Sequence, residues 1–163
     1  MHSFDDVFIL VPVYDEESVI GDVIADLKGV FNNIVAVDDG STDKSYEILK
    51  MSEISILRHP INIGVGAAIT TGFQYILNLG KAKAIVTFDG DGQHTVNDAK
   101  TFAKEILRTE SEVIFGSRFI EKNNQIPYIR KNILRLGAYL TNKFTGLELT
   151  DTHNGMIAVK TEP

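Results

Sequence analysis

Three short groups of acidic residues could do chemistry, because their carboxylate oxygens could hold a metal ion or a nucleotide. They lie at residues 15–17, 38–39 and 89–91, and each follows a short run of apolar, largely β-branched residues. Carboxylates that are brought together repel one another, so a shared site needs a cation or hydrogen-bond donors between them. A metal ion is the simplest explanation if the three groups meet.

The third group has the spacing of a divalent-cation site. Asp89 and Asp91 flank Gly90 in a sharp turn, so both carboxylates can point at one hard cation, with Gln93 or His94 close enough to help. Mg²⁺ keeps water and substrate phosphate oxygens in its other positions, and Mn²⁺ accepts the same ligands. The ion, Mg²⁺ or Mn²⁺, would therefore hold a diphosphate. Asp-Gly is also ordinary turn chemistry, which is the alternative interpretation of this tripeptide.

The second group also has two interpretations. Ser41 or Thr42 could cap the following helix, with the preceding aspartates near the positive end of its dipole. Alternatively, Asp38 or Asp39 could accept hydrogen bonds from a ribose or a base N–H beyond the end of a strand. Both interpretations can hold together, and Asp43 is then expected to act only at the start of the helix.

Small residues mark a further candidate for ligand binding. The segment 62–68, Asn-Ile-Gly-Val-Gly-Ala-Ala, lacks the third glycine of a dinucleotide fingerprint and follows the third predicted strand, not the first. This argues against an NAD site. Small residues such as Gly66 would instead let the start of a helix approach a ligand closely.

The elements that must position these residues alternate along the chain. Apolar runs that are typical of buried strands alternate with segments of helical periodicity, which predicts an α/β fold with a mainly parallel sheet and helices on both faces. In such a Rossmann-like sandwich, ligands bind beyond the carboxyl ends of the strands. The predicted strands are 7–13, 33–38, 55–59, 84–89 and 112–117, and the predicted helices are about 17–30, 42–50, 65–79 and 96–108.

Composition narrows the class of protein. The chain has 163 residues, 44% of them hydrophobic, which fits one globular domain over residues 1–163. It has no cysteine, which excludes a disulfide framework and thiolate metal ligands. A formal net charge of −6 argues against a nucleic-acid partner.

Charge is distributed unevenly. Residues 1–50 hold 11 acidic and 3 basic residues, whereas residues 116–143 hold 6 basic residues and one acidic residue. The two regions are therefore expected to face different partners. Within the second region, residues 126–136 suggest either a basic amphipathic helix at an anionic membrane surface or a core-packing helix with a solvated basic face.

Six motifs follow one another in the order found in family 2 glycosyltransferases of the GT-A fold. They are P-V-Y-D-E-E, V-D-D-G-S-T-D, N-I-G-V-G-A-A, F-D-G-D-G-Q-H, G-S-R and D-T-H-N-G. From residue 7 to about residue 159, the chain most resembles dolichyl- and polyprenyl-phosphate mannosyl- or glucosyltransferases. The resemblance implies a GT-A three-layer sandwich and metal-dependent, inverting transfer of a hexose from a GDP- or UDP-hexose to a lipid phosphate. It also implies a cytoplasmic protein, peripheral at the membrane.

The resemblance also assigns residues of this chain to the donor site. The first segment is expected to cradle the base and ribose, with Asp38 or Asp39 at the nucleoside and Gly66 near the nucleotide. Asp89 and Asp91 match the metal-binding D-x-D motif, and Gln93 matches the position that supports the metal and its diphosphate. The other residues expected at the nucleotide are Pro12, Tyr14, Glu16 and Gly90.

A second set of residues is expected on the acceptor side. Arg118 matches an arginine that reaches the acceptor phosphate or the diphosphate, and Arg130 and Lys131 add positive charge for the acceptor. Asp151, with Asn154 and Gly155, matches a late loop that shapes the sugar and acceptor pocket. Asp151 is also the nearby candidate for a base, which a hydroxyl acceptor would need and an already anionic phosphate would not.

The sequence departs from the family after the D-T-H-N-G motif. Relatives usually continue with a phenylalanine and an arginine, whereas here Met156 and Ile157 follow and the chain stops at Pro163. The chain therefore resembles a catalytic core that is truncated at its C-terminus. Sugar transfer to a saccharide hydroxyl, and nucleotide binding without turnover, remain as alternatives. A nucleotidyltransferase is disfavoured because the G-x-G-T-R segment expected after the first strand is absent.

Overall fold

A computed structural model describes residues 4–116 and 156–161 of the chain. The chain divides into two compact units, residues 1–114 with 156–163 and residues 115–155. Apart from the end of the fifth strand, every element described below belongs to the first unit. The organisation of residues 1–163 as one domain stays a prediction.

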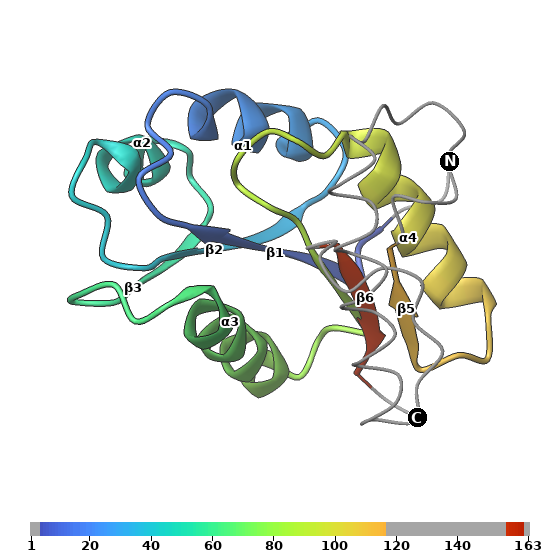
Figure 1. Ribbon diagram of the computed structural model, residues 1–163. Helices are drawn as coiled ribbons and strands as arrows, with labels where there is room; N and C mark the ends of the chain where they lie inside the picture. The colour runs from blue at the N-terminus through green and yellow to red at the C-terminus, as the bar shows by residue number, and fades with distance from the viewer. Residues whose placement is uncertain (1–3, 117–155, 162–163) are drawn as a thin grey trace, which may run out of the picture. The chain divides into compact units, whose positions relative to one another are not determined.

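Strands and helices alternate through the described part of the first unit (Figure 1). The sequence predicts this alternation, and the α/β class is confirmed. In chain order the elements are β1 (Val7–Val13), α1 (Ile20–Lys28), β2 (Asn33–Asp38), α2 (Ser45–Met51), β3 (Ser55–Arg58), α3 (Val65–Leu79), β4 (Ala84–Thr87), α4 (Val96–Arg108), β5 (Val113–Phe115) and β6 (Ile157–Lys160).

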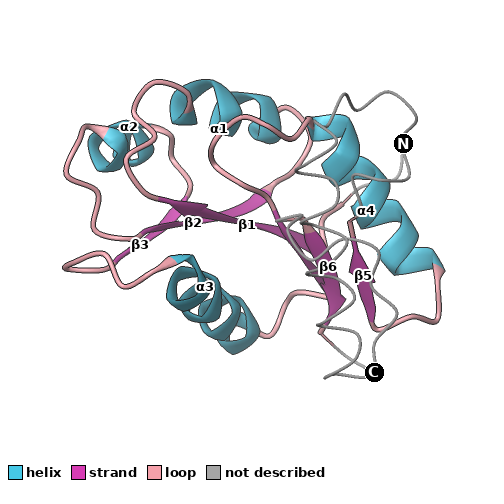
Figure 2. Ribbon diagram, viewed as in Figure 1, coloured by secondary structure: helices cyan, strands magenta, loops and turns pink. Residues whose placement is uncertain are grey.

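The strands form one mainly parallel sheet in the order β3-β2-β1-β4-β6-β5. Strand β1 lies in the middle and pairs in parallel with β2 and β4, and β2 pairs in parallel with β3. Strand β6 runs antiparallel to β4. Figure 2 shows α3 on one face of the sheet, with α1 and α2 on the other. The predicted three-layer sandwich is therefore confirmed.

Alternating side chains of the central strand β1 pack into two separate hydrophobic cores. All seven residues of β1 are buried. Ile9 and Val11 pack in the core beneath α1, α2 and α4, whereas Phe8 and Leu10 pack in the core beneath α3. This two-sided burial explains why the strand reads as an unbroken apolar run and fixes its carboxyl end between the two helical layers.

Several boundaries differ from the sequence prediction. Helix α1 begins at Ile20, not residue 17, and α2 begins at Ser45, not residue 42. Strand β4 ends at Thr87, so Asp89 lies in the loop beyond it. Strand β6 was not predicted, because four residues without periodicity carry no signal for an antiparallel strand.

Two further findings bear on the sequence predictions. The described boundaries of α3 and α4 agree with the predicted ranges. The segment 126–136, for which a basic helix is one interpretation, lies outside the described residues. Among the helices that are described, none is long and apolar enough to cross a membrane.

Candidate functional site

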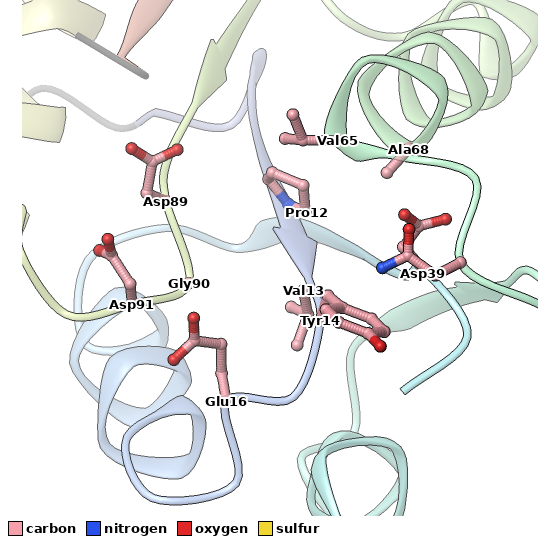
Figure 3. Close-up of a pocket in the computed structure, with 11 residues that line it drawn as sticks. Pro12, Val13, Tyr14, Glu16, Asp39, Val65, Ala68, Asp89, Gly90 and Asp91 are labelled. Carbon is pink, nitrogen blue, oxygen red and sulfur yellow. The ribbon is translucent and has the colours of Figure 1, made fainter. Parts of the chain in front are cut away.

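A cleft of about 280 Å³ opens at the carboxyl ends of β1, β2 and β4 (Figure 3). Its walls come from the end of β1, the loops that follow these three strands, the segment between β3 and α3, and the first turn of α3. Three acidic groups, far apart in the sequence, therefore meet as predicted. The lining residues are Pro12, Val13, Tyr14, Glu16, Asp39, Asn62, Val65, Ala68, Asp89, Gly90 and Asp91.

One end of the cleft is acidic. Figure 3 shows the carboxylates of Glu16, Asp89 and Asp91 on the same side of the opening. Partial burial, followed by repulsion from Asp91 and two other nearby carboxylates, raises the pKa of Glu16 above its usual value. The raised pKa of Glu16 therefore shows that negative charge is crowded at this end of the cleft. A bound cation would offset that charge.

Two neighbours hold the acidic end in place. His94 Nε2 lies 3.2 Å from Asp89 Oδ2, and this hydrogen bond is the main cause of a raised pKa at His94. The N–H of Gln93 donates to Asp91 Oδ1 over 2.9 Å. Gln93 itself is exposed and does not line the cleft, so its support of Asp91 runs through its backbone.

The carboxylate oxygens at this end of the cleft are ligands that suit Mg²⁺ or Mn²⁺. Among residues 4–116 and 156–161, no group of three or more His, Asp or Glu side chains could hold a metal alone. Mg²⁺ commonly uses one or two carboxylates and completes its shell with water and substrate phosphates. Asp89 and Asp91, which both line the open cleft, fit that pattern.

The other end of the cleft is built around Asp39. This residue is 2% exposed, and its carboxylate accepts from the N–H of Ile63 at 3.1 Å and of Gly64 at 2.8 Å. His59 Nδ1 lies 2.6 Å from Asp39 Oδ1. Burial acts to raise the pKa of Asp39, but these hydrogen bonds, led by that of His59, outweigh it and the pKa is lowered. Asp39 is therefore an ionised acceptor next to the cleft.

Asp38 has a different environment from its neighbour. Its side chain is fully buried, Arg58 Nε lies 2.9 Å from its Oδ2, and the N–H of Ser41 donates to its Oδ1 over 3.3 Å. Asp38 does not line the cleft. Of the two aspartates proposed for the nucleoside, the structure therefore places only Asp39 at the cleft.

Reciprocal hydrogen bonds, which we call the loop clasp, join the loop after β1 to the loop after β2 and the first residue of α2. The clasp fixes the backbone between Tyr14 and Glu16, so both side chains keep their places at the cleft. Backbone N–H groups of Asp15, Glu16 and Glu17 donate to Ser41 Oγ, Ser45 Oγ and Asp43 Oδ2 at 2.8 to 3.0 Å, and those of Thr42 and Lys44 donate to Asp15 Oδ1 and Glu17 Oε2 at 2.7 and 2.9 Å.

The loop clasp also corrects the capping prediction. Neither Ser41 nor Thr42 caps α2, because Lys44 is the N-cap and it makes no side-chain cap hydrogen bond. The side chains of both residues interact with Asp15 instead. Asp43 Oδ1 accepts from the N–H of Ser45, the first residue of α2, as expected for a helix-start residue.

One further predicted site residue, Gly66, lies in the described part of the chain. Gly66 is not among the described residues that line the cleft, and a Cβ added there would meet open space. Sequence reasoning missed Asn62 and His59, although both belong to the motif region between β3 and α3. Arg118, Arg130, Lys131, Asp151, Asn154 and Gly155 lie outside the described residues.

Comparison with known proteins agrees with this geometry. The family Glycosyl transferase family 2 matches residues 8–163. A protein of uncharacterised function from Methanocaldococcus jannaschii is 38% identical over 162 residues, which covers 97% of this chain and 66% of that protein. The UDP-N-acetylglucosamine–dolichyl-phosphate N-acetylglucosaminyltransferase of Methanococcus voltae is 31% identical over 172 residues, which covers 93% of this chain and 68% of the relative.

A solved structure supports the fold. Glucosyl-3-phosphoglycerate synthase from Mycobacterium tuberculosis, in complex with Mn²⁺, UDP and glucosyl-3-phosphoglycerate, superposes with a TM-score of 0.72 at 17% identity. The match covers 97% of this chain and 57% of that one. The chain thus spans between about half and two thirds of the length of its first relatives. It belongs to glycosyl transferase family 2 and has the GT-A fold of that family.

Proposed function

We propose that this chain binds a nucleotide-diphosphate hexose together with Mg²⁺ or Mn²⁺ and transfers the hexose, with inversion, to a polyprenyl or dolichyl phosphate. The observation that carries the proposal is a cleft that has paired carboxylates at one end and the ionised, buried Asp39 at the other. A sugar nucleotide has the matching polarity, because its diphosphate needs a cation and its nucleoside offers hydrogen-bond donors.

At the acidic end, Asp89 and Asp91 would hold the metal ion. When bound, the ion supplies positive charge that offsets the charge developing on the leaving diphosphate. His94 and the Gln93 N–H fix the two carboxylates, so little reorientation is needed on binding. Glu16 lies beside this charge and would face the ribose or diphosphate.

At the other end, the nucleoside would lie between β1 and α3. Tyr14 is 43% exposed and can cover the face of a base or ribose. Asp39 would accept a hydrogen bond from the nucleoside, since an ionised carboxylate can only accept. Val65 and Ala68, at the start of α3, supply the apolar wall.

The proposal that the acceptor is a lipid phosphate is supported by the names of the relatives and by the sequence. Relatives are named as dolichyl-phosphate and undecaprenyl-phosphate sugar transferases and as a dodecaprenyl-phosphate galacturonate synthase. In the proposed reaction an anionic phosphate oxygen attacks the anomeric carbon, the new C–O bond forms, and the bond to the diphosphate breaks. Arg118, Arg130 and Lys131 are proposed to bind the acceptor at the cytoplasmic membrane surface.

Direct binding tests the donor half of this proposal. UDP, GDP and CDP sugars should raise the melting temperature only with Mn²⁺ or Mg²⁺, and a ligand at 100 times its dissociation constant stabilises by about 2.7 kcal/mol. Asp91→Asn should remove the metal-dependent shift and keep the fold, whereas Asp26→Asn, an exposed acid on α1, should not change it. Unchanged calorimetric affinity of Asp91→Asn in Mn²⁺ would show that the metal assignment is wrong.

A further inference from the structure

We infer that His59, which does not line the cleft, is a positioning residue that holds the Asp39 carboxylate in the orientation needed to bind a nucleoside. The inference rests on the proposed function, because it concerns the nucleoside end of the same cleft. It adds a residue that the sequence motifs did not single out.

The hydrogen bonds at Asp39 leave one oxygen with room for a ligand. Oδ1 accepts from His59 Nδ1 and from the N–H of Ile63, which occupy its two acceptor positions. Oδ2 accepts from the N–H of Gly64, so within the described residues it keeps one acceptor position. The Asp39 side chain lines the cleft, and Oδ2 is therefore the atom that would meet the nucleoside.

The His59 ring is itself held at both nitrogens. Its side chain is 11% exposed, and Nε2 lies 3.0 Å from Thr71 Oγ1 on α3. Its backbone N–H donates to the carbonyl of Asp38 at the end of β2. The ring is thus fixed between the sheet and α3, and a rotation of the Asp39 carboxylate would break its contact with the ring.

The contact with Asp39 assigns the proton on the ring. An ionised carboxylate has no proton to give, so Nδ1 must donate across the 2.6 Å that separates it from Oδ1. A purely structural histidine would fill the space between β3 and α3, and the effect of replacing it would depend on the volume of the new side chain. A positioning histidine depends on one donor at the Nδ1 position.

Two amide substitutions separate these roles. In His59→Asn the amide nitrogen can take the place of Nδ1, whereas in His59→Gln the amide reaches only the place of Nε2. Affinity for UDP in Mn²⁺, measured by calorimetry, should stay within about threefold of the wild type in His59→Asn and fall about tenfold or more in His59→Gln. Thermal unfolding of both variants reports on the fold.

A spectrum of the unliganded wild type tests the inference without relying on either variant. Long-range ¹H–¹⁵N spectra should show the Nδ1 of His59 carrying a proton. Equal loss of UDP affinity in both variants, equal retention in both, or an unprotonated Nδ1 would overturn the positioning role alone. If the wild type binds neither UDP nor GDP with Mn²⁺, the proposed function fails first and this inference fails with it.

Discussion

Neighbouring aspartates at the end of β2 have opposite environments. Asp38 is the last residue of the strand, and its buried side chain pairs with Arg58, which in turn lies 4.0 Å from the ring centroid of Tyr46. Asp39 follows the strand and faces the cleft from the other side of the chain. Successive side chains of an extended chain point in opposite directions, which places the Asp38 carboxylate against Arg58 and the Asp39 carboxylate at the cleft.

Glu16 offers a test of the charge that the cleft concentrates. Burial and the neighbouring carboxylates raise its pKa in the folded protein, so stability is lost as the pH rises from the ordinary pKa of a glutamate to that raised value, and the full loss persists at higher pH. Glu16→Gln should therefore be the more stable protein at pH 7, by less than about 1 kcal/mol because solvent screens the charge. The difference should shrink as the pH falls and both side chains become neutral.

Thermal unfolding of both proteins from about pH 3.5 to pH 8 measures this effect. Added salt should also narrow the gap at pH 7, because it screens repulsion between exposed charges. A Glu16→Gln protein that is less stable than the wild type at pH 7 would contradict the expected sign. The predicted change is in stability, so the test does not depend on any ligand.

At the scale of secondary-structure elements, the loop clasp connects the segments that precede α1 and α2. Backbone N–H groups of residues 15–17 bond to side chains of residues 41–45, and of these three residues only Glu17 falls within the predicted range of the first helix. In return, the N–H groups of Thr42 and Lys44 donate to the side chains of Asp15 and Glu17, and residues 41–44 precede α2. Both helices start three residues later than the sequence pattern suggests, and Tyr14 and Glu16, in the loop before α1, line the cleft.

Removing the Asp15 side chain should weaken the loop clasp. Asp15 has a φ of 53° and accepts from the N–H of Thr42 over 2.7 Å. Asp15→Ala loses this acceptor in a left-handed conformation and should cost about 1–3 kcal/mol of stability. Asp15→Asn keeps an acceptor oxygen and a residue type that tolerates this φ, so it should cost less. Urea unfolding, with the exposed Asp26→Ala as control, ranks the variants.

Gly40 determines how closely the second loop approaches the segment before α3. Its φ is +72°, and an added Cβ would lie 2.4 Å from the carbonyl carbon of Ile61. Gly80, at the end of α3, has a φ of +62° with no atom within 4 Å of such a Cβ. Gly80→Ala should thus cost only the left-handed strain of about 1–2 kcal/mol, and Gly40→Ala should cost about 1–3 kcal/mol more. Equal free energies of unfolding would contradict this close approach.

The sequence predicts the elements better than it predicts their contacts. The bounds of β1, β2, α3 and α4 follow from runs of apolar residues and helical periodicity, which local burial determines. The acidic residues of the cleft are also predictable, because parallel strands bring their carboxyl ends to one edge. His59 contacts Asp39, 20 residues away in the sequence, and Gln93 acts through its backbone, so residue type alone does not reveal their roles.

At the scale of the whole molecule, acidic and basic residues are concentrated in different parts of the chain. The described residues that line the cleft all belong to the first unit, whose segment 1–50 holds 11 acidic and 3 basic residues. The basic segment 116–143 falls within the second unit, residues 115–155. Acidic residues suit a site that recruits a cation for a diphosphate, whereas basic residues suit an anionic acceptor and an anionic lipid surface.

Replacing basic residues should separate acceptor binding from donor binding. Each basic residue near an anionic bilayer contributes about 1 kcal/mol, and salt screens that attraction beyond a Debye length. The triple change of Arg130, Lys131 and Arg135 to Gln should therefore abolish salt-sensitive sedimentation with anionic liposomes and leave UDP binding in Mn²⁺ unchanged. Arg118→Ala should reduce transfer to polyprenyl phosphate more than it reduces donor affinity. Efficient transfer by the full-length protein to a neutral sugar hydroxyl, with none to polyprenyl phosphate, would overturn the acceptor assignment and leave the donor cleft as described.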